Sequence, residues 1–114
     1  SQAVVNNTGK GAPVDAVPGA VIEYTITYTN VASTGGTNSY TLNATNFVII
    51  DDGGAAPNNW ETHTYYQSGE VDSQGAAIVV SNSTNGVTQA RYTSTLATLP
   101  AGASGTLLLK RIIK

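Results

Sequence analysis

Few side chains of this chain could take part in acid–base or nucleophilic chemistry. His63 is the one histidine, and it lies among threonines without the serine or cysteine context that would make it a general base. The sequence contains no cysteine, which excludes disulfides and thiolate metal ligands within it. We therefore predict that the protein is not an enzyme, with no catalytic residue and no cofactor.

Acidic residues near expected turns are the next candidates, because carboxylate oxygens on loops suit calcium. Their spacing matches no calcium-binding loop motif, so we interpret them as turn-capping and solvated carboxylates and predict no metal site. The residues in question are Asp51, Asp52, Glu61, Glu70 and Asp72.

Several aromatic residues could form a platform for a sugar ring, although a β-sandwich also needs large apolar side chains in its core. Neighbouring residues of a strand point to opposite faces, so at least one of Tyr65 and Tyr66 is expected outside the core. Surface glycans are therefore an alternative partner. The aromatic residues concerned are Tyr40, Trp60, Tyr65 and Tyr66.

Two covalent modifications are conceivable from the residue types. An intramolecular Lys–Asn isopeptide bond would need Lys10 or Lys110 in an apolar pocket beside an acid such as Glu23, which falls on the polar face of its strand. Three Asn-X-Ser/Thr sequons permit glycosylation without arguing for it, since about two or three are expected by chance in so Asn-, Ser- and Thr-rich a chain. They begin at Asn6, Asn43 and Asn82.

The strands that would carry these residues are indicated by alternation of apolar and polar positions. Residues 22–29 alternate strictly and predict a half-buried strand. Its core-facing residues are expected to be Ile22, Tyr24, Ile26 and Tyr28. Residues 31–43 indicate a surface loop or ragged edge hairpin, and Asn85-Gly86 suits a tight hairpin turn. Further strands are expected at 47–50, 62–67, 76–81, 87–96 and 106–113, with an optional first strand at 3–5.

Composition limits the fold and the partners. A chain of 114 residues fits one domain, and strands recurring without a helical period are typical of a sandwich. We predict an all-β, immunoglobulin-like sandwich of about seven strands over 17–114, preceded by an N-terminal arm over 1–16. The net charge of −2 with five Lys and Arg excludes nucleic-acid binding, and no apolar stretch predicts a membrane span.

Three segments in order resemble a known family. They are PG at 18–19 leading into IEYTITYTN at 22–30, ATNFVIIDD at 44–52, and LPAGAS at 99–104. Together they are similar to the conserved-repeat module called domain of unknown function 11, which is found in bacterial and archaeal surface proteins. The resemblance implies an immunoglobulin-like sandwich, an extracellular, cell-surface location and no enzymatic activity, and it supplies no functional residues.

The last expected strand departs from the family pattern because it is apolar on both faces. If no bulge intervenes, Leu107, Leu109 and Ile113 face the core and Leu108 and Ile112 face outward. An outward apolar stripe of this kind indicates that another subunit covers it.

The arm suggests how such a subunit would assemble. Val4 and Val5 precede a polar, glycine-containing stretch that we expect to act as a flexible hinge. Sixteen extended residues reach about 55 Å, so the arm could cross a domain of roughly 35 Å and pair with an edge strand of a neighbour. We predict an extracellular structural subunit that forms a homopolymeric filament or pilus-like fibre. The alternatives are a spacer repeat of a large prokaryotic surface protein and a carbohydrate-binding adhesin module.

Overall fold

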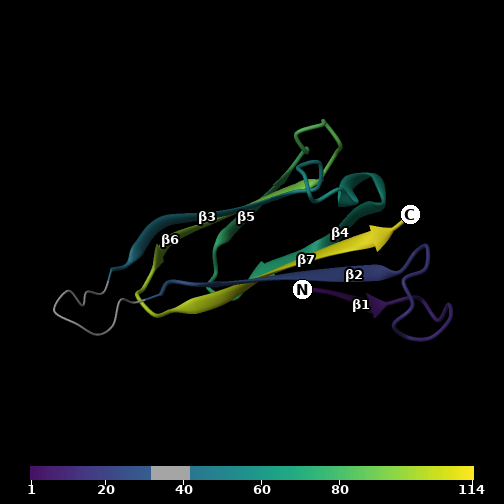
Figure 1. Cartoon of the computed structure of the whole chain (residues 1–114), viewed down its shortest axis with the longest axis horizontal. Coiled ribbons are helices and arrows are strands. Elements are labelled where there is room, and N and C mark those ends of the chain that lie inside the picture. The colour runs from purple at the N-terminus through teal and green to yellow at the C-terminus, as the bar shows by residue number, and fades with distance from the viewer. Residues whose placement is uncertain (32–41) are drawn as a thin grey trace.

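The computed structural model describes residues 1–31 and 42–114, and it consists of strands with one short 3-10 helix (Figure 1). The expected loop at 31–43 and Tyr40 fall almost wholly outside the described residues. No helix within the described ranges is long and apolar enough to cross a membrane. The elements are β1 (Gln2–Asn6), β2 (Val21–Thr29), β3 (Ala44–Asp52), η1 (Trp60–Thr62), β4 (Thr64–Asp72), β5 (Ala77–Ser81), β6 (Arg91–Leu99) and β7 (Ser104–Ile113).

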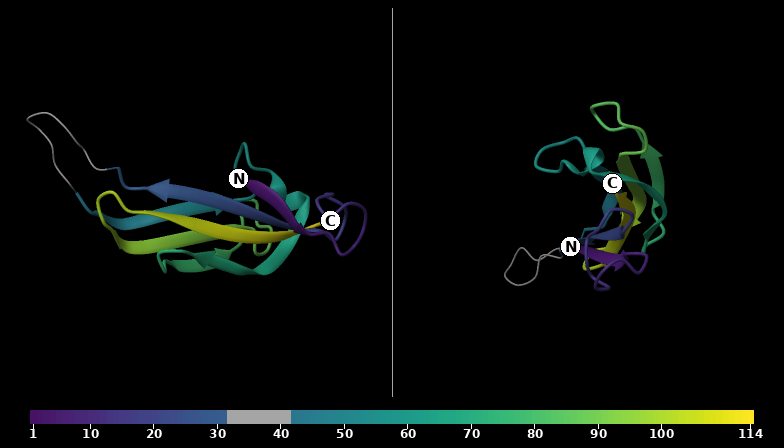
Figure 2. Two further views of the ribbon diagram at one scale, coloured as in Figure 1. Left: turned by 90° about the horizontal axis from the view of Figure 1, so that it is seen from below. Right: turned by 90° about the vertical axis from the view of Figure 1, so that its right-hand side faces the viewer.

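These strands form two antiparallel sheets packed as a sandwich, which confirms the predicted all-β class. Sheet A is the four-stranded sheet with the order β1-β2-β7-β4, and sheet B is the three-stranded sheet with the order β3-β6-β5. Figure 2 shows the two layers from below and from one end. Since β4 contacts β5, the sheets meet along that side, and β1 and β3 are the edges of the opposite side.

Strand β2 has the predicted alternation. Ile22 and Tyr28 are buried, while Tyr24 and Ile26 are half-buried and pack against the core from its margin. Side chains of the opposite parity, such as Thr27, point away from sheet B. The register of this strand is therefore the one that the sequence predicted.

The centre of the sandwich is small. Tyr92 from β6 contacts Leu107 and Leu109 from β7, and all three are almost fully buried. A ring of half-buried side chains surrounds this cluster, among them Trp60 and Ile49. The fold therefore rests on the two central strands, β6 and β7.

Some boundaries differ from the sequence-based expectation. Strand β6 begins at Arg91 rather than at position 87, because residues 82–90 form a long connection from β5. Within this connection the Gly86 N–H donates to the Ser83 carbonyl at 2.9 Å, so Asn85-Gly86 lies in a turn of the loop and not in a two-residue hairpin. Helix η1 delays the start of β4 to Thr64.

Candidate functional site

Strand β1 is attached to the sandwich almost entirely through its backbone. It pairs antiparallel with β2, and Ser1 and Thr25 exchange hydrogen bonds of 2.6 and 2.8 Å. None of its side chains is buried: Val4 is half-buried on the core side and Val5 is 49% exposed on the other face. The strand therefore contributes backbone hydrogen bonds to sheet A without completing the core.

The segment that joins β1 to β2 is folded, which corrects the expectation of a flexible hinge. The buried Asn7 side chain donates hydrogen bonds to the carbonyls of Lys10 and Ala12 and accepts one from Gly9 N–H at 3.1 Å. Thr8 and Gly9 adopt the left-handed backbone conformation that this turn needs. Asn7 thus organises a compact turn at the point where β1 would have to separate from its own domain.

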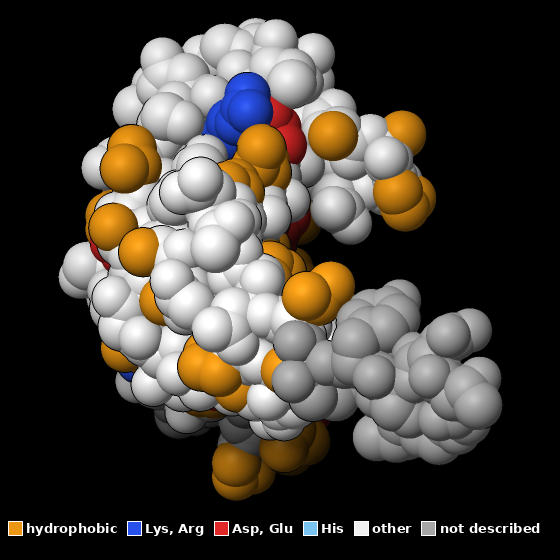
Figure 3. Space-filling view, turned by 90° about the vertical axis from the view of Figure 1, so that its left-hand side faces the viewer, with side chains coloured by type: hydrophobic (Ala, Val, Ile, Leu, Met, Phe, Trp, Pro, Cys, Tyr) orange, Lys and Arg blue, Asp and Glu red, His pale blue; other side chains and the backbone are white. Residues whose placement is uncertain are grey.

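The side of the sandwich between β1 and β3 is not closed. Tyr28 of sheet A contacts Phe47 of sheet B with ring centroids 5.1 Å apart, and the ring centroid of Tyr24 lies 6.4 Å from that of Trp60 in η1. Tyr24, Phe47 and Trp60 nevertheless remain only half-buried. Figure 3, which looks along the sandwich from one end, shows the molecule hollowed on one side. This open side is where an additional strand would find apolar contacts.

The outer face of sheet A carries the apolar stripe that the sequence predicted. Leu108 and Ile112 point away from the core and are half-buried by their neighbours on β2 and β4. Ile112 lies between Val21 and Tyr65 in one cross-strand row, and Leu108 lies between Thr25 and Val71 in another; Tyr65 and Val71 are 59% and 52% exposed.

The inner face of the same strand holds a charged residue that sequence reasoning missed. Arg111 continues the buried series of Leu107 and Leu109, and only 1% of its surface is exposed, whereas Ile113 lies on the same inner face, as predicted, and is half-buried. Its guanidinium lies 4.4 Å from the centre of the Trp60 ring and donates to Thr64 Oγ1 at 3.0 Å. It also donates to the Gln89 and Thr64 carbonyls and to the hydroxyl of Tyr92.

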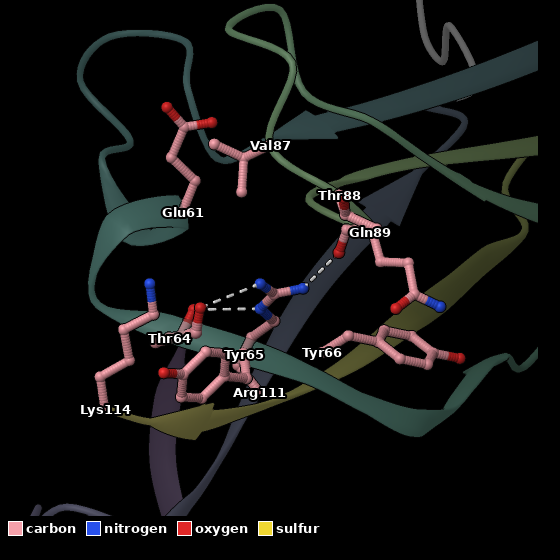
Figure 4. Close-up of a pocket in the computed structure, with 9 residues that line it drawn as sticks. All are labelled: Glu61, Thr64, Tyr65, Tyr66, Val87, Thr88, Gln89, Arg111 and Lys114. Carbon is pink, nitrogen blue, oxygen red and sulfur yellow. Dashed lines mark hydrogen bonds between the residues drawn. The ribbon is translucent and has the colours of Figure 1, made fainter.

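A pocket of about 370 Å³ opens beside this arginine (Figure 4). Its lining includes Tyr65, Tyr66, Gln89 and Lys114, whose amine lies 4.8 Å from the Tyr65 ring centre. Because Arg111 makes four hydrogen bonds to protein groups, its charge is already engaged within the fold. The pocket is therefore a surface depression at the edge of the core, with tyrosine side chains in its lining and without a free charge from Arg111.

The carboxylates act mainly on backbone turns and tyrosine hydroxyls. Asp52 accepts from Gly54 and Thr84 N–H and lies 3.9 Å from Arg91. Asp72 accepts from Gln74 N–H and from the hydroxyl of Tyr28; burial, together with this hydrogen bond, raises the pKa of Tyr28 to about 12.

The remaining acids are equally dispersed. Glu70 accepts from the hydroxyl of Tyr66, and burial raises the pKa of the Asp51 carboxyl. Glu61 is buried, with one oxygen bonded to Asn85 and Oε2 without a hydrogen-bond partner among the described residues. In Figure 4 its carboxylate points away from Arg111. Within 1–31 and 42–114, no group of three acidic or histidine side chains could hold a metal ion.

The other sequence candidates do not gather at one site. His63 is exposed at the end of η1, and Tyr65 and Tyr66 point to opposite faces of β4, as predicted. Trp60 lies between Tyr24 and Tyr92 and under Arg111, so its half-buried ring packs against the core. The three sequon asparagines, at positions 6, 43 and 82, are all exposed.

No family model, no curated protein and no solved structure matches this chain. The resemblance to domain of unknown function 11 therefore remains a prediction from the three motifs.

Proposed function

We propose that this chain is an extracellular structural subunit that assembles with copies of itself into a cell-surface filament or pilus-like fibre by strand addition. The observation that carries the proposal is the attachment of β1. It is held by backbone hydrogen bonds along β2 and buries no side chain, so its departure would leave the small core of Tyr92, Leu107 and Leu109 in place.

Exchange of β1 between copies would preserve its interactions. The same backbone groups of β2 would receive the same strand from a neighbour, with Val4 again beside Ile22. The fourteen residues between Asn6 and Val21 would span up to about 50 Å when extended, which requires the turn built on Asn7 to open. The shorter dimensions of the molecule are 32 and 24 Å, so the strand could reach an adjacent subunit.

Two features of the surface favour assembly over an isolated domain. The open side between β1 and β3 leaves Tyr24 and Phe47 half-exposed, and the outer face of sheet A presents Leu108 and Ile112 within an apolar stripe. A contact with another copy would remove this apolar surface from water. We accordingly assign the subunit interface to Val4, Val5, Leu108 and Ile112.

The resemblance of the three motifs supports an immunoglobulin-like topology and an extracellular location. We propose no catalytic role for this chain. A spacer repeat of a larger surface protein is the competing structural role. A spacer needs neither an exchangeable β1 nor a covered sheet face, so the spacer role does not explain either feature.

Deletion of residues 1–10 tests the proposal. We expect the shortened chain to fold, because β1 buries no side chain and the buried Asn7 side chain, which is also lost, bonds to its own turn over residues 9–12. It should nevertheless sediment as a monomer under conditions in which the full chain forms fibres. A peptide of residues 1–10 should bind the shortened chain, since the edge of β2 is then vacant. The same measurement on Val14→Ser, at a 74% exposed position of the connecting segment, provides the control that should still assemble.

Fibres that persist after the deletion would rule out assembly by β1. A full-length chain that stays monomeric at every accessible concentration would favour the spacer role instead.

A further inference from the structure

The outer face of sheet B presents apolar side chains in two adjacent cross-strand rows. Ile50 and Val79 flank Thr93 in one row, and they are 52% and 61% exposed. Val48, which is 48% exposed, and Ala77 flank Thr95 in the next row. These rows lie on the opposite side of the sandwich from the stripe that contains Leu108 and Ile112. They therefore form a separate surface, which we call the B face.

The B face carries almost no charge. Its outward residues are aliphatic or bear hydroxyl groups, apart from the exposed, uncharged Asn46 near one end and Asp52 and Arg91, which lie 3.9 Å apart at the other end. Its edge strands, β3 and β5, present no lysine or proline of the kind that blocks edge-to-edge pairing. A partner chosen by complementary charge would find nothing to recognise at the centre of this face.

The B face of a second copy is a better contact partner for the B face than the outer face of sheet A is. Contact of the B face with the outer face of sheet A would cover Glu23 and Lys110, which lie opposite each other in the middle of that face, with a surface that has no charged group at its centre to pair with them. Two B faces would instead bury aliphatic side chains against hydroxyl-bearing and aliphatic neighbours. A contact of one patch with its own copy is two-fold and closes at a dimer.

We infer that the B face is a self-association surface on which two copies of this chain pair back to back. This pairing involves neither β1 nor the outer face of sheet A, so it is independent of strand exchange. In a fibre it would join two strands of subunits side by side.

The test needs a full chain that cannot exchange β1. Ala3 and Glu23 are directly opposite each other, and the hydrogen-bonded Ser1–Thr25 pair two residues away makes them a hydrogen-bonded pair as well. Such pairs have Cα atoms about 5.5 Å apart, within the range of a disulfide. Ala3→Cys with Glu23→Cys, oxidised in dilute solution, would lock β1 onto its own β2, and the chain has no other cysteine.

Sedimentation equilibrium of this locked chain should show association of monomers into a dimer. Ile50→Lys and, separately, Val79→Lys should each weaken the dimer about a hundredfold, because each two-fold contact would bury two unpaired amines. Val71→Lys is the matched control, since Val71 has the same 52% exposure as Ile50 but lies on sheet A. It should leave the dimer intact, and circular dichroism would establish that each variant folds.

A locked chain that stays monomeric would overturn the inference. So would a dimer that is insensitive to both lysines on the B face, or one that Val71→Lys abolishes. None of these results bears on whether the unlocked chain forms fibres by exchanging β1.

Discussion

Replacement of Arg111 by methionine should lower the free energy of unfolding by about 3 to 5 kcal/mol. The methionine would fill much of the space, but it would leave the Gln89 carbonyl and the Thr64 carbonyl and hydroxyl without their donor. It would also remove the guanidinium from the face of Trp60. Urea denaturation followed by tryptophan fluorescence measures the loss, because Trp60 is the single tryptophan.

Lys110→Met provides the control, since its side chain lies on the outer face of the same strand and makes no ion pair among the described residues. It should cost less than about 1 kcal/mol. Equal losses for the two variants would mean that Arg111 does not occupy the interior in solution.

Alanine substitution of two neighbouring leucines of β7, Leu107 and Leu108, should lower the free energy of unfolding by clearly different amounts. Leu107 is fully buried in the central cluster, so Leu107→Ala should cost about 3 to 5 kcal/mol through lost burial and the cavity left behind. Leu108 is half-buried on the outer face, and Leu108→Ala should cost less than about 1.5 kcal/mol in the monomer. Denaturant midpoints of the two variants give a comparison in which the chemical change is identical.

The same pair also separates folding from assembly. Leu108→Ala should raise the concentration at which fibres form, because its side chain belongs to the proposed interface. A loss of stability at position 108 as large as that at position 107 would contradict the assignment of the two faces of β7.

The orientation of the β2 side chains could be predicted from the sequence, because apolar residues mark the buried face and polar residues mark the exposed face. Strict alternation over residues 22–29 leaves one register that buries Ile22 and Tyr28. The sequence also predicted that both faces of β7 are apolar, since Leu107 and Leu108 are consecutive and must point to opposite faces. The sandwich and the outward stripe follow from these two strands.

Arg111 could not be predicted in the same way. A charged residue near the end of an apolar run is normally solvated, and the groups that satisfy this one come from Thr64 and Gln89, which are distant in sequence. The turn built on Asn7 was missed because its hydrogen bonds go to backbone carbonyls that any sequence would supply. The start of β6 was misplaced because apolar Val87 resembles a strand residue, although it lies in the β5–β6 loop.

The B face was visible only once the strands were paired. Alternation within a strand does not show which strands pair, so the sequence could not place Val48, Ile50 and Val79 side by side. Pairing through Thr93 and Thr95 brings them together on one side of sheet B.

Pairing of β1 of one copy with β2 of another can be tested directly in the fibre. Fibres of the chain with Ala3→Cys and Glu23→Cys, assembled under reducing conditions and then oxidised, would be run on a denaturing gel without reductant. Exchange places the cysteine introduced at position 3 opposite position 23 of a neighbour and predicts a ladder of covalently linked subunits. The pair Thr27→Cys with Thr106→Cys, which joins β2 to β7 within one chain, should give only monomers from the same fibres. A single monomer band from the 3–23 pair would show that each β1 stays on its own sandwich, and would contradict the account.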